Sequence, residues 1–420
     1  MSKVLEELQW RGLVSQHTDI EALSQALEAG PVTYYCGFDP TAPSLHHGHL
    51  VQLVLLRHLQ LAGHNPVALV GGATGLIGDP RMSGERVLNS KEVVADWVER
   101  LQTQISKFLS FEGDNAAVMV NNLDWHAELS ALDFLRDVGK HYRLGTMLAK
   151  DTVARRLNSS EGISFTEFSY QILQGMDFLE LNRRHGVTLQ TGGNDQWGNL
   201  LSGVELIRKS EHKSVHALTT PLITKADGTK FGKSEGGAVW LDAGMMSPYA
   251  FYQFWINAAD EDVIGWLKTF TFRSREEIDA LQVSMEEKPF LREAQKALAF
   301  DVTALVHGED ATNQAIEAAS ALFGRGELTG LDLATLDGAT ADLAKVEITV
   351  GSSILDAVVE SELEKGRGAA RRAIADGGLY VNNEKVAGED AVFTQDQLLA
   401  GKWAILRRGK RTLAAAYVAG

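Results

Sequence analysis

The chain has 420 residues, 45% of them hydrophobic, and a net charge of −15. This length exceeds one ordinary domain, so two or three domains are expected, and the acidity argues against a general nucleic-acid binder. The single cysteine, Cys36, excludes an intrachain disulfide framework and favours a cytoplasmic location. No apolar run reaches 18 residues, so no membrane-spanning helix is expected. The first ten residues also lack the apolar core of a signal peptide.

The first 250 residues alternate β-rich and helical segments. Such alternation predicts a parallel α/β sheet, whose ligands bind at the carboxyl ends of the strands. Gly-bearing loops follow the first two predicted strands, which places them at such ends. The expected elements are a helical pair over 1–30, strands over 32–38, 66–72 and 116–122, and helices over 44–62 and 101–109.

The remaining chain changes character twice. Residues 250–323 are expected to be helical, and residues 324–344, rich in Gly, Ala, Thr and Asp, are expected to form a linker. Two short helices and two hairpins, one turning at Asn382-Asn383, should follow. Residues 351–420 hold ten Lys/Arg against nine Asp/Glu, whereas the first 350 residues carry −16. The C-terminal segment is therefore the one region that does not share the negative net charge of the chain.

The stretch "SLHHGHL" (44–50) opens the helix after the first predicted strand. A helix N-terminus attracts phosphate, and His46 and His49, three apart, share one face and could both donate hydrogen bonds to it. Gly48 costs about 1 kcal/mol of helix stability, which close approach of a flat ligand would explain. An ordinary polar helix end and half of a zinc site are alternatives, although no Cys or acidic zinc partner lies at a useful spacing.

The stretch "TKADGTKFGKSEGG" (224–237) combines Lys225, Lys230 and Lys233 with four glycines. It predicts either a solvated loop or a mobile cationic loop that closes on a polyphosphate. Neither a G-x-x-x-x-G-K-[ST] nor a G-x-G-x-x-G motif is present.

Together, H-x-G-H and a downstream K-x-x-K-S resemble the two signature motifs of the class I aminoacyl-tRNA synthetases. The stretches "YYCGFDPTAPSLHHGHL", "VGGATGLIGDP", "SYQILQGMDFLEL" and "GGNDQWGN" further resemble the bacterial tyrosyl-tRNA synthetases, and the resemblance spans essentially the whole chain. It implies a Rossmann-like catalytic domain (1–224), a signature loop with a helical tRNA-contacting domain (225–323), a linker (324–350) and a small α+β domain similar to S4-type RNA-binding domains (351–420).

The helix expected after Ser164 carries one polar stripe, because Tyr170, Gln174 and Asp177 lie at i, i+4 and i+7. Ser164 and Glu167 predict a capping box at its start. By resemblance, Tyr170, Gln174 and Asp79 bind the α-amino group of tyrosine, Asp177 and Tyr35 bind its phenolic hydroxyl, and Gln196 lines the same pocket.

The resemblance also implies an ATP site and a set of phosphate-binding residues. Its ATP-binding residues would be Gly37, Asp39, His46, Gly48, His49, Gly192, Asp195 and Lys233. Thr41 and His46 would contact the γ-phosphate, His49 would lie near the nucleotide, and Lys230 and Lys233 would neutralise departing pyrophosphate. Mg²⁺ should accompany ATP, with no dedicated metal site. In the loop 79–86, Arg81 or Arg86 would replace a lysine that many family members carry.

The implied reaction is tyrosine activation by ATP followed by transfer of the tyrosyl group to the 3′ end of its tRNA, carried out by a homodimer. The predicted tRNA-binding residues are Arg371, Arg372, Arg407, Arg408, Lys410 and Arg411. The alternatives are a tryptophanyl-tRNA synthetase or another H-x-G-H adenylyl-transferring enzyme, and a catalytically silent RNA-binding paralogue. The pair Tyr35 and Asp177 favours tyrosine, and intact His46, His49, Lys230 and Lys233 argue against a silent copy.

Overall fold

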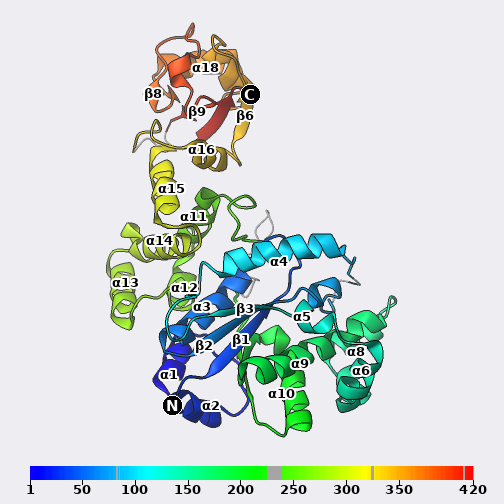
Figure 1. Cartoon of the computed structure of the whole chain (residues 1–420). Coiled ribbons are helices and arrows are strands. Elements are labelled where there is room, and N and C mark those ends of the chain that lie inside the picture. Colours follow the sequence, from blue (N-terminus) through cyan, green and yellow to red (C-terminus); the bar gives the residue numbers. More distant parts are fainter. Residues whose placement is uncertain (82–83, 85, 225–237, 323–325, 410–411, 420) are drawn as a thin grey trace. The chain divides into compact units, whose positions relative to one another are not determined.

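The computed structural model describes residues 1–81, 84, 86–224, 238–322, 326–409 and 412–419 (Figure 1). The chain forms two compact units. The first unit comprises Met1–Asp242 and Ala259–Ala294, and the second comprises Ala243–Ala258 and Gln295–Gly420. Among the helices of the described residues, none combines the length and the apolarity that crossing a membrane requires.

The first unit is built on a five-stranded parallel sheet with the order β3-β2-β1-β4-β5, as the alternating pattern predicts. The central strand β1 is covered on both faces: Tyr34 donates to the Leu56 carbonyl in α3, whereas Tyr35 packs against Phe178 in α9. The strands are β1 (Thr33–Phe38), β2 (Asn65–Val70), β3 (Val118–Asn121), β4 (Leu189–Gly193) and β5 (His216–Thr220).

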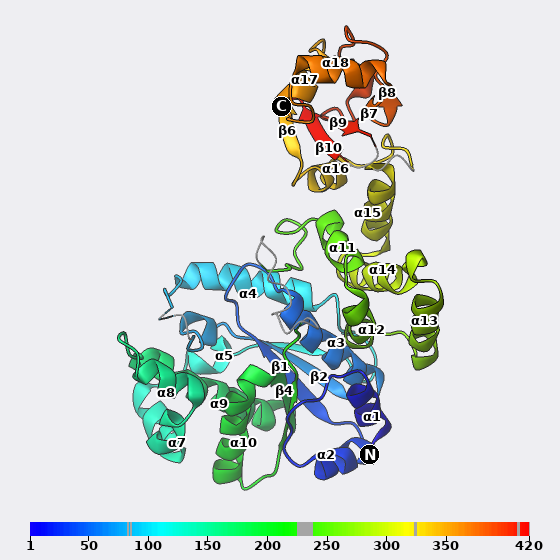
Figure 2. The same cartoon turned by 180° about the vertical axis from the view of Figure 1, so that it is seen from behind.

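Helices cover both faces of this sheet, which Figures 1 and 2 show from opposite sides. Helices α3 and α4 pack on β2, and α10 packs on β4 and β5. The helices of this unit are α1 (Lys3–Trp10), α2 (Ile20–Ala29), α3 (His47–Leu61), α4 (Lys91–Ile105), α5 (Leu123–His126), α6 (Ala131–Asp133), α7 (Leu144–Leu148), α8 (Asp151–Leu157), α9 (Phe165–His185), α10 (Trp197–Glu211), α12 (Asp260–Phe270) and α13 (Arg275–Glu287).

Helix α9 begins as predicted, but its capping box is only half formed. The Ser164 hydroxyl accepts from the Glu167 backbone N–H at 3.3 Å. The Glu167 carboxylate does not return to the cap, because it forms a buried ion pair with Arg156 at 2.9 Å. Arg156 also donates to the Arg81 carbonyl at 2.7 Å. This pair therefore ties the start of α9 to the loop that carries Asp79.

The second unit contains a mixed sheet with the order β6-β10-β9-β7-β8. Along β9, Trp403 and Ile405 pack with α15 and α16, whereas Ala404 and Leu406 pack in a second core with α17 and α18. The strands are β6 (Ala344–Glu347), β7 (Leu379–Val381), β8 (Glu384–Lys385), β9 (Trp403–Arg408) and β10 (Thr412–Tyr417). The helices are α11 (Pro248–Ile256), α14 (Glu293–His307, starting at the boundary), α15 (Glu309–Leu322), α16 (Leu333–Ala339), α17 (Ile354–Glu360) and α18 (Arg367–Ala375).

Of two sequence-based predictions for the second unit, the hairpin turn is confirmed and the linker is wrong. The hairpin β7–β8 turns at Asn382 and Asn383, whose φ angles of 48° and 69° are typical of Asn in such turns. Residues 324–350, expected to form a linker, instead contain α16 and β6, and β6 pairs in parallel with β10. The Gly- and Thr-rich composition of this segment obscures its few apolar positions. Leu331, Leu336 and Ala339 are nevertheless buried in the core beneath β9.

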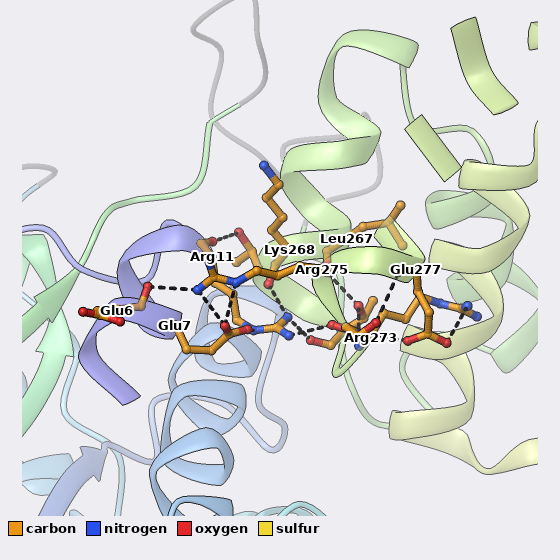
Figure 3. Close-up of polar contacts among 11 residues, drawn as sticks. Glu6, Glu7, Arg11, Leu267, Lys268, Arg273, Arg275 and Glu277 are labelled. Carbon is orange, nitrogen blue, oxygen red and sulfur yellow. Dashed lines mark hydrogen bonds and ion pairs between the residues drawn. The ribbon is translucent and has the colours of Figure 1, made fainter. Parts of the chain in front are cut away.

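Arg11 fastens the end of α1 to the connection between α12 and α13 (Figure 3). Its guanidinium donates to the carbonyls of Lys268, Thr271 and Arg273 at 3.0, 2.8 and 2.7 Å and pairs with Glu7 at 2.8 Å. The Arg11 side chain is only 4% exposed. These contacts join segments about 260 residues apart in the sequence within the first unit.

We predict that Arg11→Met lowers the free energy of unfolding of the first unit by about 3 kcal/mol or more, because it leaves buried carbonyls without donors. Urea unfolding followed by tryptophan fluorescence measures this change. Arg275→Met is the matched control, because Arg275 pairs with the same Glu7 but is 44% exposed and should cost less than about 1 kcal/mol. Equal losses in the two variants would contradict the anchoring role of Arg11.

Candidate active site

The polar residues of the predicted site gather where the parallel strands of the first unit end. Asp39 follows β1, Thr74 lies in a 3₁₀ turn after β2, and Asn122 follows β3. Asp195 lies in the turn after β4, which precedes α10. This edge is the expected ligand-binding position of a doubly wound sheet.

His46 and His49 cap the start of α3 reciprocally. His46 Nδ1 accepts from the Gly48 backbone N–H at 3.1 Å, and His49 Nδ1 accepts from the His46 backbone N–H at 3.2 Å. The two rings lie 4.0 Å apart. Because both Nδ1 atoms accept, each neutral ring carries its proton on Nε2, which leaves two N–H donors at this helix start.

Burial keeps the two histidines uncharged. It lowers the pKa of His46, and it lowers the pKa of His49 further, with help from the neighbouring His46 and His47. At neutral pH these residues can therefore serve as hydrogen-bond donors to phosphate but not as positive charges.

Gly48 has a local explanation that differs from the expected approach of a ligand. A Cβ at this position would lie 2.9 Å from His46 Cε1. The imidazole of His46 therefore occupies the space that a side chain would need. The absence of a Cβ permits the histidine cap.

The segment after the signature loop returns to this helix start. The Leu241 N–H donates to the Leu45 carbonyl, and the His47 N–H donates to the Val239 carbonyl, both at 2.9 Å. Lys230 and Lys233 themselves lie outside the described residues.

Asp39 joins two predicted substrate contacts in one network. Its carboxylate accepts from Tyr170 at 2.5 Å and from Thr74 at 2.6 Å. Burial raises the pKa of Asp39 to about 6, although both hydrogen bonds oppose the shift. The resemblance assigns Asp39 to ATP, whereas the bond to Tyr170 favours a position beside the α-amino group of tyrosine.

A cavity of about 270 Å³ opens beside Asp79. The Asp79 carboxylate accepts from Gln196 at 3.0 Å and from Asn199 at 3.3 Å, and burial raises its pKa. Lys150, which also lines the cavity, donates to Asn199, and burial lowers its pKa to about 8. The pocket thus combines a carboxylate with a cation.

Several buried polar side-chain atoms have no hydrogen-bond partner among the described residues, and two of them belong to neighbouring residues of β1 and β4. They are the Tyr35 hydroxyl and Gln190 Oε1. Tyr35 and Gln190 are paired neighbours on β1 and β4, and they are 1% and 2% exposed. Buried polar groups are normally satisfied, so these two atoms mark a position where a ligand could supply the missing hydrogen bonds.

Asp177 is held by three donors, one from Asn122 between β3 and α5 and two from α5 itself. Its Oδ1 accepts from Trp125 Nε1 at 2.9 Å and lies 2.8 Å from His126 Nε2. Its Oδ2 accepts from Asn122 Nδ2 at 3.1 Å. Asn122 also donates to Thr74, which in turn donates to Asp39, so one network connects Asp177 with Tyr170.

The other predicted residues fall into two groups. Tyr170, half-buried Gln174 and Asp177 lie on α9 at the predicted spacing. Among the residues predicted to bind ATP, Gly37, Thr41 and Asp195 are exposed. Gly192 is instead buried against Leu200 and Gln196.

The predicted tRNA-binding residues lie in the second unit, in different environments. Arg372 is exposed, Arg371 pairs with Glu389 at 2.8 Å, and Arg408 pairs with buried Glu364. Arg407 is 8% exposed and stacks 4.0 Å over the Tyr380 ring. Lys410 and Arg411 lie outside the described residues.

Sequence reasoning missed several polar residues of this site. Asn122 and His126 follow the third strand, the expected ligand edge, and their position there was the available signal. Lys150 lies in no quoted motif, and Asn199 closes "GGNDQWGN" without a role of its own. Among the described residues, no group of three His, Cys, Asp or Glu could hold a metal ion.

Family models match both parts of the chain. The model for "tRNA synthetases class I (W and Y)" covers residues 27–324. The model for the "Tyrosine--tRNA ligase SYY-like C-terminal domain" covers residues 336–415.

Whole proteins and a solved structure agree with these models. Tyrosine–tRNA ligases of Streptomyces avermitilis and Streptomyces coelicolor are 60% and 59% identical over the full length of both chains. The C-terminally truncated mitochondrial tyrosyl-tRNA synthetase of Aspergillus nidulans superposes with a TM-score of 0.70 at 30% identity, covering 76% of this chain and 94% of that one. Because identity of this level extends from end to end, this chain belongs to the tyrosine–tRNA ligases, a family of class I aminoacyl-tRNA synthetases.

Proposed function

We propose that the network between Asp177 and Tyr170 holds tyrosine at its two ends. As a tyrosine–tRNA ligase, the chain joins tyrosine to tRNA at the expense of ATP. The phenolic hydroxyl of tyrosine would meet Tyr35 and Asp177, and its ammonium group would meet Asp39, Asp79, Tyr170 and Gln174. Gln196 would line the pocket beside Asp79.

The unpartnered hydroxyl of Tyr35 is the observation that carries this assignment. A phenol can donate to the Asp177 carboxylate and accept from Tyr35, which satisfies both. Phenylalanine would leave the buried Tyr35 hydroxyl unpaired and Asp177 without a further donor, and an unpaired buried polar group costs about 1–3 kcal/mol. Tyrosine is therefore favoured over phenylalanine and tryptophan by the polarity of this end of the pocket.

The first step needs positioning and charge stabilisation more than a general base. The tyrosine carboxylate attacks the α-phosphorus of ATP, forming one P–O bond while the bond to pyrophosphate breaks. Thr41 and the Nε2–H groups of His46 and His49 would bind phosphate oxygens, and Lys230 and Lys233 would supply the positive charge that the neutral histidines lack. Gly37, Gly48, Gly192 and Asp195 complete the proposed ATP-binding set.

Mg²⁺ is proposed to enter with ATP, since phosphate oxygens are ligands that it prefers. The single, buried Cys36 is consistent with the cytoplasm as the place of action. In the second step a hydroxyl of the 3′-terminal adenosine of tRNA attacks the tyrosyl carbonyl of the adenylate, so that the ester to tRNA forms while the bond to the phosphate breaks and AMP leaves. Exposed Arg372, together with Arg371, Arg407, Arg408, Lys410 and Arg411, is proposed to contact tRNA phosphates in the second unit.

We further propose that the chain forms a homodimer through residues 132–165. Six large apolar side chains in this one segment are exposed, and this concentration along the chain favours an interface. They are Leu132, Leu135, Leu144, Leu148, Leu157 and Phe165, with exposed fractions from 37% to 78%.

Tyrosine-dependent exchange between ATP and pyrophosphate tests the function. We expect exchange with tyrosine but not with phenylalanine or tryptophan. Asp177→Asn should lower kcat/KM for tyrosine about 50-fold, because the phenol loses a charged acceptor. Asp124→Asn, a neighbouring exposed carboxylate on α5, is the matched control and should behave like the unmodified chain. No exchange with any amino acid would instead support the silent RNA-binding paralogue.

The raised pKa of Asp39 predicts an acid limb in the pH profile. Protonation of Asp39 removes the negative charge that faces the ammonium, so kcat/KM for tyrosine should be constant above about pH 7 and fall as the pH drops below about 6. Burial lowers the pKa values of His46 and His49, so their protonation would also act on the acid side, and the Asp39 variant separates these sources. Asp39→Asn should remove it. A limb that persists in this variant would assign it to another group, first of all Asp79.

Dimerisation predicts a mass of about twice 45.8 kDa in sedimentation equilibrium. Phe165→Asp should shift the population toward the single-chain mass, because a charge cannot be buried in an apolar interface without cost. Phe290→Asp is the matched control, since Phe290 is comparably exposed at 79% but lies outside the segment 132–165. A monomeric unmodified chain, or equal dissociation in both variants, would refute the interface.

A further inference from the structure

The three donors that surround Asp177 are divided unevenly between its two carboxylate oxygens. Oδ1 faces both Trp125 Nε1 and His126 Nε2, at 2.9 and 2.8 Å, whereas Oδ2 accepts from Asn122 alone in the described part of the chain. The Asp177 and His126 side chains are only 3% and 7% exposed. Solvent therefore has little access to this arrangement.

This asymmetry decides which oxygen remains available. A carboxylate offers about two acceptor positions on each oxygen. Trp125 and His126 fill those of Oδ1, so the open position belongs to Oδ2. The unpartnered Tyr35 hydroxyl belongs to the same buried cluster as Trp125. A phenol that accepts from Tyr35 would thus donate to Oδ2.

Trp125 and Asn122 are each held by a second contact as well. His126 acts on Asp177 through its hydrogen bond to Oδ1. The Arg184 guanidinium lies 5.5 Å over the Trp125 ring, and Asn122 accepts from the Ala73 N–H at 2.7 Å. Both residues are therefore fixed from a second side. Removing His126 would leave Oδ1 with one donor, and the carboxylate could then rotate or take up water at the vacant position.

We propose that His126 is a positioning residue for tyrosine selection: by occupying Oδ1 it directs Oδ2 of Asp177 at the phenolic hydroxyl. The inference rests on the proposed function, because it assigns the phenol to Asp177. His126 does not touch the reacting carboxylate or phosphate, so its effect belongs to the binding of tyrosine and not to the chemical step.

The test compares His126→Phe, which keeps an aromatic ring without the donor, with His126→Gln, which restores an N–H. Tyrosine- and phenylalanine-dependent exchange is measured for each. His126→Phe should raise KM for tyrosine about tenfold, leave kcat within about twofold, and leave the weak phenylalanine reaction unchanged. The preference for tyrosine then falls about tenfold. His126→Gln should recover most of it. His185→Phe, an exposed histidine at the end of α9, is the matched control.

Other results would overturn the inference. An equal loss for both amino acids, or a fall in kcat alone, would mean that His126 only supports the fold. The same is true if His126→Gln is no better than His126→Phe. Should His126→Phe lose its circular dichroism spectrum, His126→Leu and the Gln variant carry the same comparison. If the unmodified chain exchanges with no amino acid, the proposed function itself fails, a result distinct from normal exchange that is insensitive to His126.

Discussion

The hydrogen-bonded chain from Asp177 through Asn122, Thr74 and Asp39 to Tyr170 is the interaction on which the rest of the site depends. It crosses the carboxyl ends of three parallel strands and closes on a single helix, α9. Because the members are largely withdrawn from water, each holds its neighbour in one orientation. In the proposed function, one hydrogen-bonded network would therefore contact both ends of the bound tyrosine, in place of two independent groups.

The two histidines at the start of α3, proposed to bind phosphate, are held in a different way. The Nδ1 atoms of His46 and His49 accept hydrogen bonds from backbone N–H groups at the start of α3, which fixes the tautomer of each ring. Burial lowers the pKa of both side chains and keeps them neutral. In the proposed function, Lys230 and Lys233 of the signature loop would supply the positive charge for pyrophosphate. Under this proposal, neutral donors at the helix start would recognise ATP, and the two lysines would stabilise the negative charge that develops in the reaction.

The sequence correctly predicted the features that depend on local periodicity. The sheet followed from alternating segments, and the stripe of Tyr170 and Asp177 followed from the helical repeat. His126 could not be found in this way, because its partner lies 51 residues away and only the packing of α5 against α9 brings them together. Helix α16 was missed for a similar reason, since the burial of Leu336 depends on packing beneath β9, about 70 residues later in the chain.

The mixed sheet of the second unit is buried on both faces, with Trp403 and Ile405 on one side and Ala404 and Leu406 on the other. Successive residues of a strand alternate between faces, so a one-residue insertion in β9 would send each side chain into the wrong core. The large Trp403 would then have to fit a space shaped for alanine. Substitutions of similar size should be tolerated in this strand, whereas changes in its length should not. Evolutionary drift in this unit is therefore expected to alter the chemistry of its turns before it alters their spacing.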